Sequence, residues 1–147
     1  MADTTYLKKV VEPYVREQLE KEFGIRFKSM ILILTTGGTH EFDAVSNDLK
    51  IVGAIKTAGG RTVSQKNPSG KIKDAEAELY YLTIVQARIR MLILTSPEFY
   101  GILQNRLKGR LAPGLTLKLI QLPIEIQQEV AKIQQTASTE VSKALKR

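Results

Sequence analysis

The chain has 147 residues, a length typical of one domain, and we treat residues 1–147 as a single fold unit. Its 22 Lys and Arg exceed its 15 Asp and Glu, which gives a formal net charge of +7 and a pI near 9.7. Hydrophobic residues make up 43% of the chain, enough for a packed core and too many for a disordered protein. The absence of cysteine excludes disulfides, thiolate zinc sites and cysteine nucleophiles, and one histidine leaves little room for histidine-built metal sites.

No segment of the sequence indicates a membrane protein or a secreted one. The apolar runs Met30–Leu34 and Met91–Leu94 are far shorter than the ~20 residues that a membrane span needs. The first ten residues contain no apolar stretch that could serve as a secretory signal. We therefore expect a cytoplasmic protein without a membrane partner.

The positive charge favours a polyanionic partner, because Lys and Arg that neutralise phosphates release counterions. A charge excess can also serve only to keep a chain in solution. The charge alone leaves both interpretations open.

The first predicted element is a helix over Thr4–Phe23, where apolar residues recur at helical spacing and Gly24 provides the stop. Pro13 interrupts this pattern. Either the stable helix begins near Pro13, or the helix bends there.

Three strands joined by tight turns follow. Gly37-Gly38 and Asn47-Asp48 are the turns, and the strands are Lys28–Thr35, Thr39–Ser46 and Lys50–Thr57. Strict alternation in the second strand places Phe42 and Ala44 on one face and Glu41, Asp43 and Val45 on the other. In the third strand, alternation separates Ile51, Gly53 and Ile55 from Val52, Ala54 and Lys56.

The second half alternates helices and strands after a polar loop at Ala58–Lys73. The predicted elements are a helix at Asp74–Arg88, a strand at Arg90–Thr95, a helix from Pro97 to about Leu111, a strand at Leu115–Leu122 and a helix from Pro123. The order α-β-β-β-α-β-α-β-α predicts an α/β fold. Its mixed sheet contains an antiparallel three-strand meander, flanked by helices.

The segment Glu41–Lys56, EFDAVSNDLKIVGAIK, carries the strongest chemical pattern. Neighbouring antiparallel strands lie about 4.8 Å apart, so Asp43 can face the stretch from Ala54 to Lys56. An acid and a lysine are thereby predicted to share one site.

This segment resembles the PD-(D/E)XK nuclease superfamily, the restriction-endonuclease-like fold. The family pattern is an Asp on the second strand followed by (Asp/Glu)-x-Lys on the third, and the likeness covers about Thr4–Thr95. The resemblance implies that Asp43 binds metal, that Lys56 is the catalytic lysine, and that DNA is the substrate.

Ala54 departs from the family pattern, because the family has its second metal-binding carboxylate there. The resemblance implies a Mg²⁺ (or Mn²⁺) ion that polarises the scissile phosphate and activates a water, with the lysine stabilising charge. Asp43 alone should hold Mg²⁺ weakly. We therefore expect the endonuclease to be impaired as written.

Two explanations of Ala54 are open. A glutamate was replaced deliberately to trap a nuclease with intact substrate, or the chain is a natural relative that does not cut. The retained Lys56 favours the first explanation, since a long-decayed site would have lost the lysine as well.

Further candidates have competing structural interpretations. The resemblance implies a metal-binding glutamate on the first helix, for which Glu17 and Glu20 are the candidates; pairing with Arg16 and Lys21 is the alternative. Glu41 is either an auxiliary ligand or one member of a cross-strand salt bridge, and His40 is expected to be structural.

Basic residues after the third strand are candidate phosphate contacts, or else solvated loop residues. They are Arg61, Gln65, Lys66, Lys71 and Lys73. A second basic cluster, Arg106, Lys108 and Arg110, is explained equally well by a helix end. We expect Tyr80 and Tyr81 to be core residues.

The sequence thus predicts a Mg²⁺-dependent DNA endonuclease, impaired at Ala54. The C-terminal apolar stripe and the need for two active sites to cut a duplex suggest a homodimer. A non-catalytic nucleic-acid-binding or assembly subunit is the alternative, and an RNA-processing factor is a third possibility.

Overall fold

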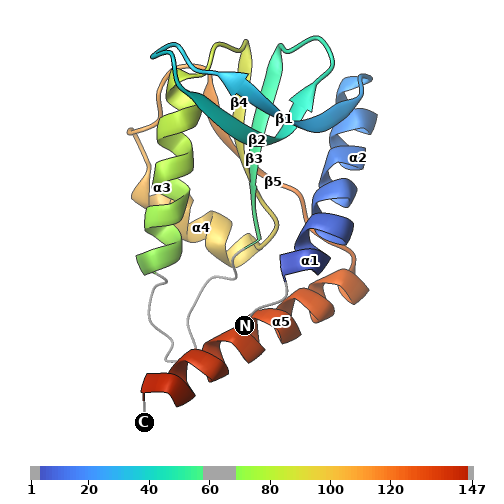
Figure 1. Cartoon of the computed structure of the whole chain (residues 1–147), viewed down its shortest axis with the longest axis vertical. Coiled ribbons are helices and arrows are strands. Elements are labelled where there is room, and N and C mark those ends of the chain that lie inside the picture. Colours follow the sequence, from blue (N-terminus) through green and yellow to red (C-terminus); the bar gives the residue numbers. More distant parts are fainter. Residues whose placement is uncertain (1–3, 58–68, 146–147) are drawn as a thin grey trace.

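A mixed five-strand sheet with helices on both faces forms the centre of the protein, as the computed structural model shows for residues 4–57 and 69–145 (Figure 1). The strands are β1 (Phe27–Ile33), β2 (Thr39–Ser46), β3 (Ile51–Lys56), β4 (Ile89–Leu94) and β5 (Leu115–Leu119). The helices are α1 (Thr4–Tyr6), the π-helical turn η1 (Leu7–Val11), α2 (Glu12–Phe23), α3 (Ser69–Ile84), α4 (Pro97–Arg106) and α5 (Ile124–Leu145). The predicted α/β class and element order are confirmed.

The strands lie in the sheet in chain order. β1, β2 and β3 form the expected antiparallel meander, whereas β4 is parallel to β3 and β5 is parallel to β4. Parallel neighbours need crossover connections, and α3 and α4 lie in those connections. In Figure 1, α3 and α2 stand on opposite sides of the sheet.

Each face of the sheet has its own apolar core. One core joins Ala54 and Leu92 of the sheet to Leu79 of α3 and Phe99 of α4. The other joins Ile55 to residues of the first helical segment and to Val130 of α5. The alternation predicted for β3 is therefore confirmed, with Ala54 facing α3 and Ile55 facing α2.

The N-terminal helix changes its winding just before Pro13. The backbone N–H of Glu12 donates to the carbonyl of Leu7, five residues earlier, which is the π-helical pattern. Pro13 lies in the first turn of α2, directly after this π-helical turn, so the change in winding coincides with the residue that cannot donate a helical hydrogen bond. Gly24, with φ of 70°, ends the helix as expected.

The boundaries of the later elements differ from the prediction. α3 begins at Ser69 and ends at Ile84, so Lys71 and Lys73 lie on a helix and not in a loop. The reason is Ile72, which is buried and begins a helical apolar spacing that the polar residues around it conceal. α4 is also shorter than predicted, since it ends at Arg106.

No helix in residues 4–57 and 69–145 is long and apolar enough to cross a membrane.

Candidate functional site

A β-bulge in β2 sets the position of Asp43. Met30 pairs with Phe42 and Lys28 pairs with Val45, so one residue of β1 is matched by two residues of β2, Asp43 and Ala44. Phe42 and Val45 therefore contribute to the same core, on the α3 face. The predicted strict alternation is wrong at this point, because the extra residue shifts the side-chain pattern.

The bulge lies where β2 and β3 stop pairing. Their ladder consists of Ala44 with Gly53 and Val45 with Val52, close to the turn that joins them. The rest of β3, as far as Lys56, continues to pair with β4 on its other side. We call the unpaired part between Asp43 and the Ala54–Lys56 segment the strand gap.

The side chain of Asp43 bridges the strand gap. Its Oδ2 accepts a hydrogen bond from the backbone N–H of Ile55 at 2.8 Å. The charge of Lys56, the next residue, also acts on this carboxylate. The predicted approach of Asp43 to the Ala54–Lys56 segment is thus confirmed.

Asp43 is in an environment that opposes its ionisation. Burial raises the pKa of Asp43 above the ordinary value, and the negative charge of Glu78 raises it further. The Ile55 N–H and the cations Lys56 and Arg16 act in the opposite direction without overcoming the burial. A carboxylate held in this way is typical of sites where a cation binds or a proton moves.

Helix α2 contributes Glu12 and Arg16 to this site. The Arg16 guanidinium donates to the backbone carbonyl of Asp43 at 2.9 Å and lies 3.8 Å from the Glu12 carboxylate. Burial raises the pKa of Glu12, and so does the charge of Asp43. Glu12 was missed in the sequence because one acid beside Pro13 carries no periodic signal.

The two glutamates expected on this helix have other contacts. Glu17 is exposed and lies 3.7 Å from Lys21, as in the alternative interpretation. The Glu20 carboxylate accepts the backbone N–H of Phe27 at 2.9 Å and so ties the end of α2 to β1. The acid of α2 whose charge is coupled to that of Asp43 is therefore Glu12.

On the α3 face, Glu78 links Lys56 to His40. One Glu78 oxygen lies 4.0 Å from Lys56 Nζ, and the other lies 3.2 Å from His40 Nε2. The His40 ring stacks on Tyr81 at 3.9 Å between centroids. His40 thus contacts both helix side chains, and Glu78 is a second acid that sequence reasoning missed.

Ala54 is fully buried in the α3-face core. It projects from β3 to the same face as Lys56, two residues later. Within the described residues, no three His, Asp or Glu side chains are grouped closely enough to hold a metal ion. The residues present thus offer Mg²⁺ an incomplete ligand set.

Comparisons with protein-family models, curated proteins and solved structures found no match. The geometry and chemistry of the site must therefore carry the functional argument.

The remaining candidates are dispersed. Lys71 and Lys73 are exposed near the start of α3, while Arg61, Gln65 and Lys66 lie outside the described residues. Glu41 accepts a hydrogen bond from the Ser29 hydroxyl at 3.4 Å on the neighbouring strand. Its role here is a cross-strand contact.

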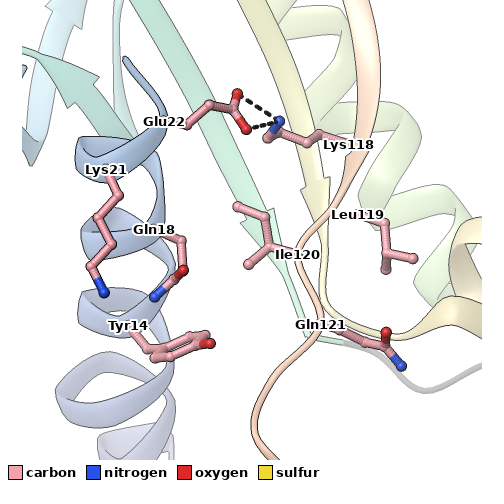
Figure 2. Close-up of a pocket in the computed structure, with 8 residues that line it drawn as sticks. All are labelled: Tyr14, Gln18, Lys21, Glu22, Lys118, Leu119, Ile120 and Gln121. Atoms are coloured by element: carbon pink, nitrogen blue, oxygen red, sulfur yellow. Dashed lines mark hydrogen bonds and ion pairs between the residues drawn. The ribbon is translucent and has the colours of Figure 1, made fainter. Parts of the chain in front are cut away.

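A separate hollow of about 450 Å³ lies between α2 and β5 (Figure 2). Both of its cations are paired: Lys118 with the two carboxylate oxygens of Glu22, each at 2.8 Å, and Lys21 with Glu17 at 3.7 Å. Tyr14 and Gln18 of α2 line it, and neither belongs to the strand gap. The charge of this hollow is largely balanced within the protein.

Proposed function

We propose that this chain is a metal-dependent DNA endonuclease scaffold of the PD-(D/E)XK type, impaired because Ala54 replaces the second metal-binding carboxylate. The observation that carries the proposal is the 2.8 Å contact of Asp43 with the Ile55 N–H, beside Lys56. It joins the acid of the family pattern to the strand segment that ends in Lys56, which supports the proposal. The meander, the bulge and the helix bearing Glu12 support the same interpretation.

The residues of this chain would divide the work as follows. Asp43, helped by Glu12, would hold the metal ion, and Lys56 would stabilise negative charge that develops on the phosphate. Glu78, whose carboxylate lies 4.0 Å from Lys56 Nζ, would orient this ammonium. A bound Mg²⁺ or Mn²⁺ would supply Lewis acidity and lower the pKa of a water.

Restoring the carboxylate tests the proposal. The Ala54→Glu variant should gain Mg²⁺-dependent cleavage of DNA, and the isosteric Ala54→Gln variant should not, because only the glutamate adds a metal ligand. Circular dichroism and DNA binding establish that both variants fold. A glutamate variant that folds and binds DNA but cuts nothing would contradict the proposal.

The second candidate is a non-catalytic nucleic-acid-binding or assembly subunit. The complete burial of Ala54 among apolar side chains favours it, since a methyl group fits that environment well. Calorimetric titration with Ca²⁺, which avoids turnover, separates the two. The enzyme scaffold should gain a metal site with glutamate at position 54, and the binding subunit should gain none.

The other proposals concern partners. DNA is the proposed polyanion, and a homodimer would provide the two active sites that cutting both strands requires.

A further inference from the structure

Tyr80 lies on the surface, contrary to the expectation that both tyrosines of α3 are core residues. It is 58% exposed, while the neighbouring Tyr81 packs against the α3-face core. The two rings meet edge to face with centroids 5.6 Å apart. An exposed aromatic ring supported by a second ring is a platform on which another flat group can stack.

Tyr80 also lines a hollow of about 480 Å³ between α3 and the segment that follows α4. Leu79, Leu107 and Leu111 give this hollow apolar walls, and Arg110 adds a cation. Glu76 lines it as well, and its carboxylate is paired with Arg106 at 3.1 Å. Its size lies within the range of small-molecule sites. The combination suits a ligand with a flat apolar part and a negative charge.

The cation of this hollow is available, in contrast to Lys118 in the hollow of Figure 2. Of the neighbouring basic residues, Arg106 is paired with Glu76 at 3.1 Å. Arg110 forms no ion pair with any acidic side chain in the part of the chain that the structure describes. Arg110 can therefore contact an external phosphate.

A continuous row of contacts joins this hollow to the strand gap. Tyr80 touches Tyr81, which stacks on His40, and His40 bonds to Glu78, which lies 4.0 Å from Lys56 Nζ. Tyr81, Glu78 and the Lys56 ammonium all lie on the α3 side of the sheet, so a strand bound near Lys56 can extend toward Tyr80 on that side. The row gives the hollow a fixed position relative to Lys56.

We propose that the hollow beside Tyr80 binds an unpaired nucleobase of a nucleic-acid strand, with its phosphate on Arg110. This rests on the proposed function and specifies its substrate class, a nucleic acid with a single-stranded segment. A paired base hides its faces within the duplex stack, whereas an unpaired base can stack on an aromatic ring. The hollow therefore distinguishes single-stranded from double-stranded nucleic acid and does not distinguish one base sequence from another.

Binding to the unaltered chain tests the proposal, with EDTA present to prevent cleavage. The probes are a fluorescein-labelled oligothymidine strand and a fluorescein-labelled blunt-ended DNA duplex, which has no unpaired base. Tyr80→Ala should weaken binding of the single strand roughly 5- to 150-fold, the range for losing one stacked base, and change duplex binding less than about twofold. Tyr80→Phe should retain the affinity, because it keeps the ring.

A tryptophan reporter locates the contact, since the chain contains no tryptophan. Fluorescence of Tyr80→Trp should be quenched by the single strand, with the same midpoint as the anisotropy titration. Ile124→Trp is the matched control, because Ile124 is 60% exposed and lies outside the hollow. Arg110→Gln should reduce the salt dependence of single-strand binding by about one counterion.

Several results would overturn the proposal: no single-strand binding, equal losses for both probes in Tyr80→Ala, or an unquenched Tyr80→Trp in a chain that binds the strand. Failure here leaves the proposed function intact if Ala54→Glu cuts duplex DNA. Conversely, a selective loss in Tyr80→Ala together with an inactive Ala54→Glu would keep the nucleobase site and remove the nuclease.

Discussion

The strand pair β2–β3 is built differently at its two ends. At the turn, Ser46 is buried, and its hydroxyl donates to Asp48 Oδ1 at 2.6 Å and accepts the N–H of Ile51 at 2.9 Å. At the other end, the strands separate and Asp43 reaches across the strand gap to Ile55. Near the turn the two strands pair through their backbones, whereas at the other end the Asp43 carboxylate takes the place of a backbone partner for Ile55.

The two aspartates show what this difference means electrostatically. Hydrogen bonds from Ser46 and from the backbone of Lys50 lower the pKa of Asp48 below its ordinary value. Burial raises the pKa of Asp43. The charge of Asp48 thus favours folding, while the charge of Asp43 opposes it, as expected of a residue placed for a function.

The largest effect should come from Lys56 at the gap end. With glutamate at position 54, Lys56→Met should lower the cleavage rate by about 100-fold or more, because the ammonium no longer stabilises charge on the phosphate. DNA binding should change only slightly. Single-turnover cleavage with gel analysis measures the rate.

Lys71→Met in the same background is the control for Lys56→Met. Lys71 is exposed near the start of α3, so its loss should affect binding and leave the cleavage step nearly unchanged. Equal loss of rate in both variants would remove the distinction between Lys56 and the general positive charge.

A substitution at the turn end should lower the stability of the protein and leave the cleavage rate unchanged. Ser46→Ala leaves the N–H of the buried Ile51 without its partner and should lower the free energy of unfolding by about 1–3 kcal/mol. Urea denaturation measures this. Ser29→Ala, which removes an exposed 3.4 Å contact to Glu41, should change the free energy of unfolding by less than about 0.5 kcal/mol.

The sequence was sufficient for regular parts of this strand pair and insufficient for the bulge. Alternation in β3 placed Ala54 and Lys56 correctly because β3 is regular and buried on both faces. The same rule failed at Phe42 and Val45, since an inserted residue leaves no mark in the hydrophobic pattern. The approach of Asp43 to β3 could be predicted, but its hydrogen bond with the backbone N–H of Ile55 could not.

Residues supplied by helices were the hardest to predict. Glu12 and Glu78 both act on Asp43, yet each lies on a helix remote in sequence from β2. Their rotation toward the gap depends on which apolar residues the helix buries, such as Val15 of α2 and Leu79 of α3. Tertiary packing therefore selected the acids, whereas the family resemblance had suggested Glu17 and Glu20.

The smallest effect should come from removing the charge of each aspartate in turn. The two substitutions should shift the Tm in opposite directions, which tests the contrast between the two ends directly. Above its raised folded pKa, ionised Asp43 opposes folding, so Asp43→Asn should raise the Tm at neutral pH. Both proteins should converge below the ordinary carboxyl value of 3.8, where Asp43 is protonated in the folded and unfolded states. Asp48→Asn should lower the Tm at neutral pH, and this difference should disappear as the pH falls through the lowered folded pKa of Asp48. Calorimetric melting of the three proteins from acid to neutral pH provides the measurement. If both substitutions lower the Tm at neutral pH, Asp43 is a stabilising residue like Asp48, and its burial no longer argues for a functional site.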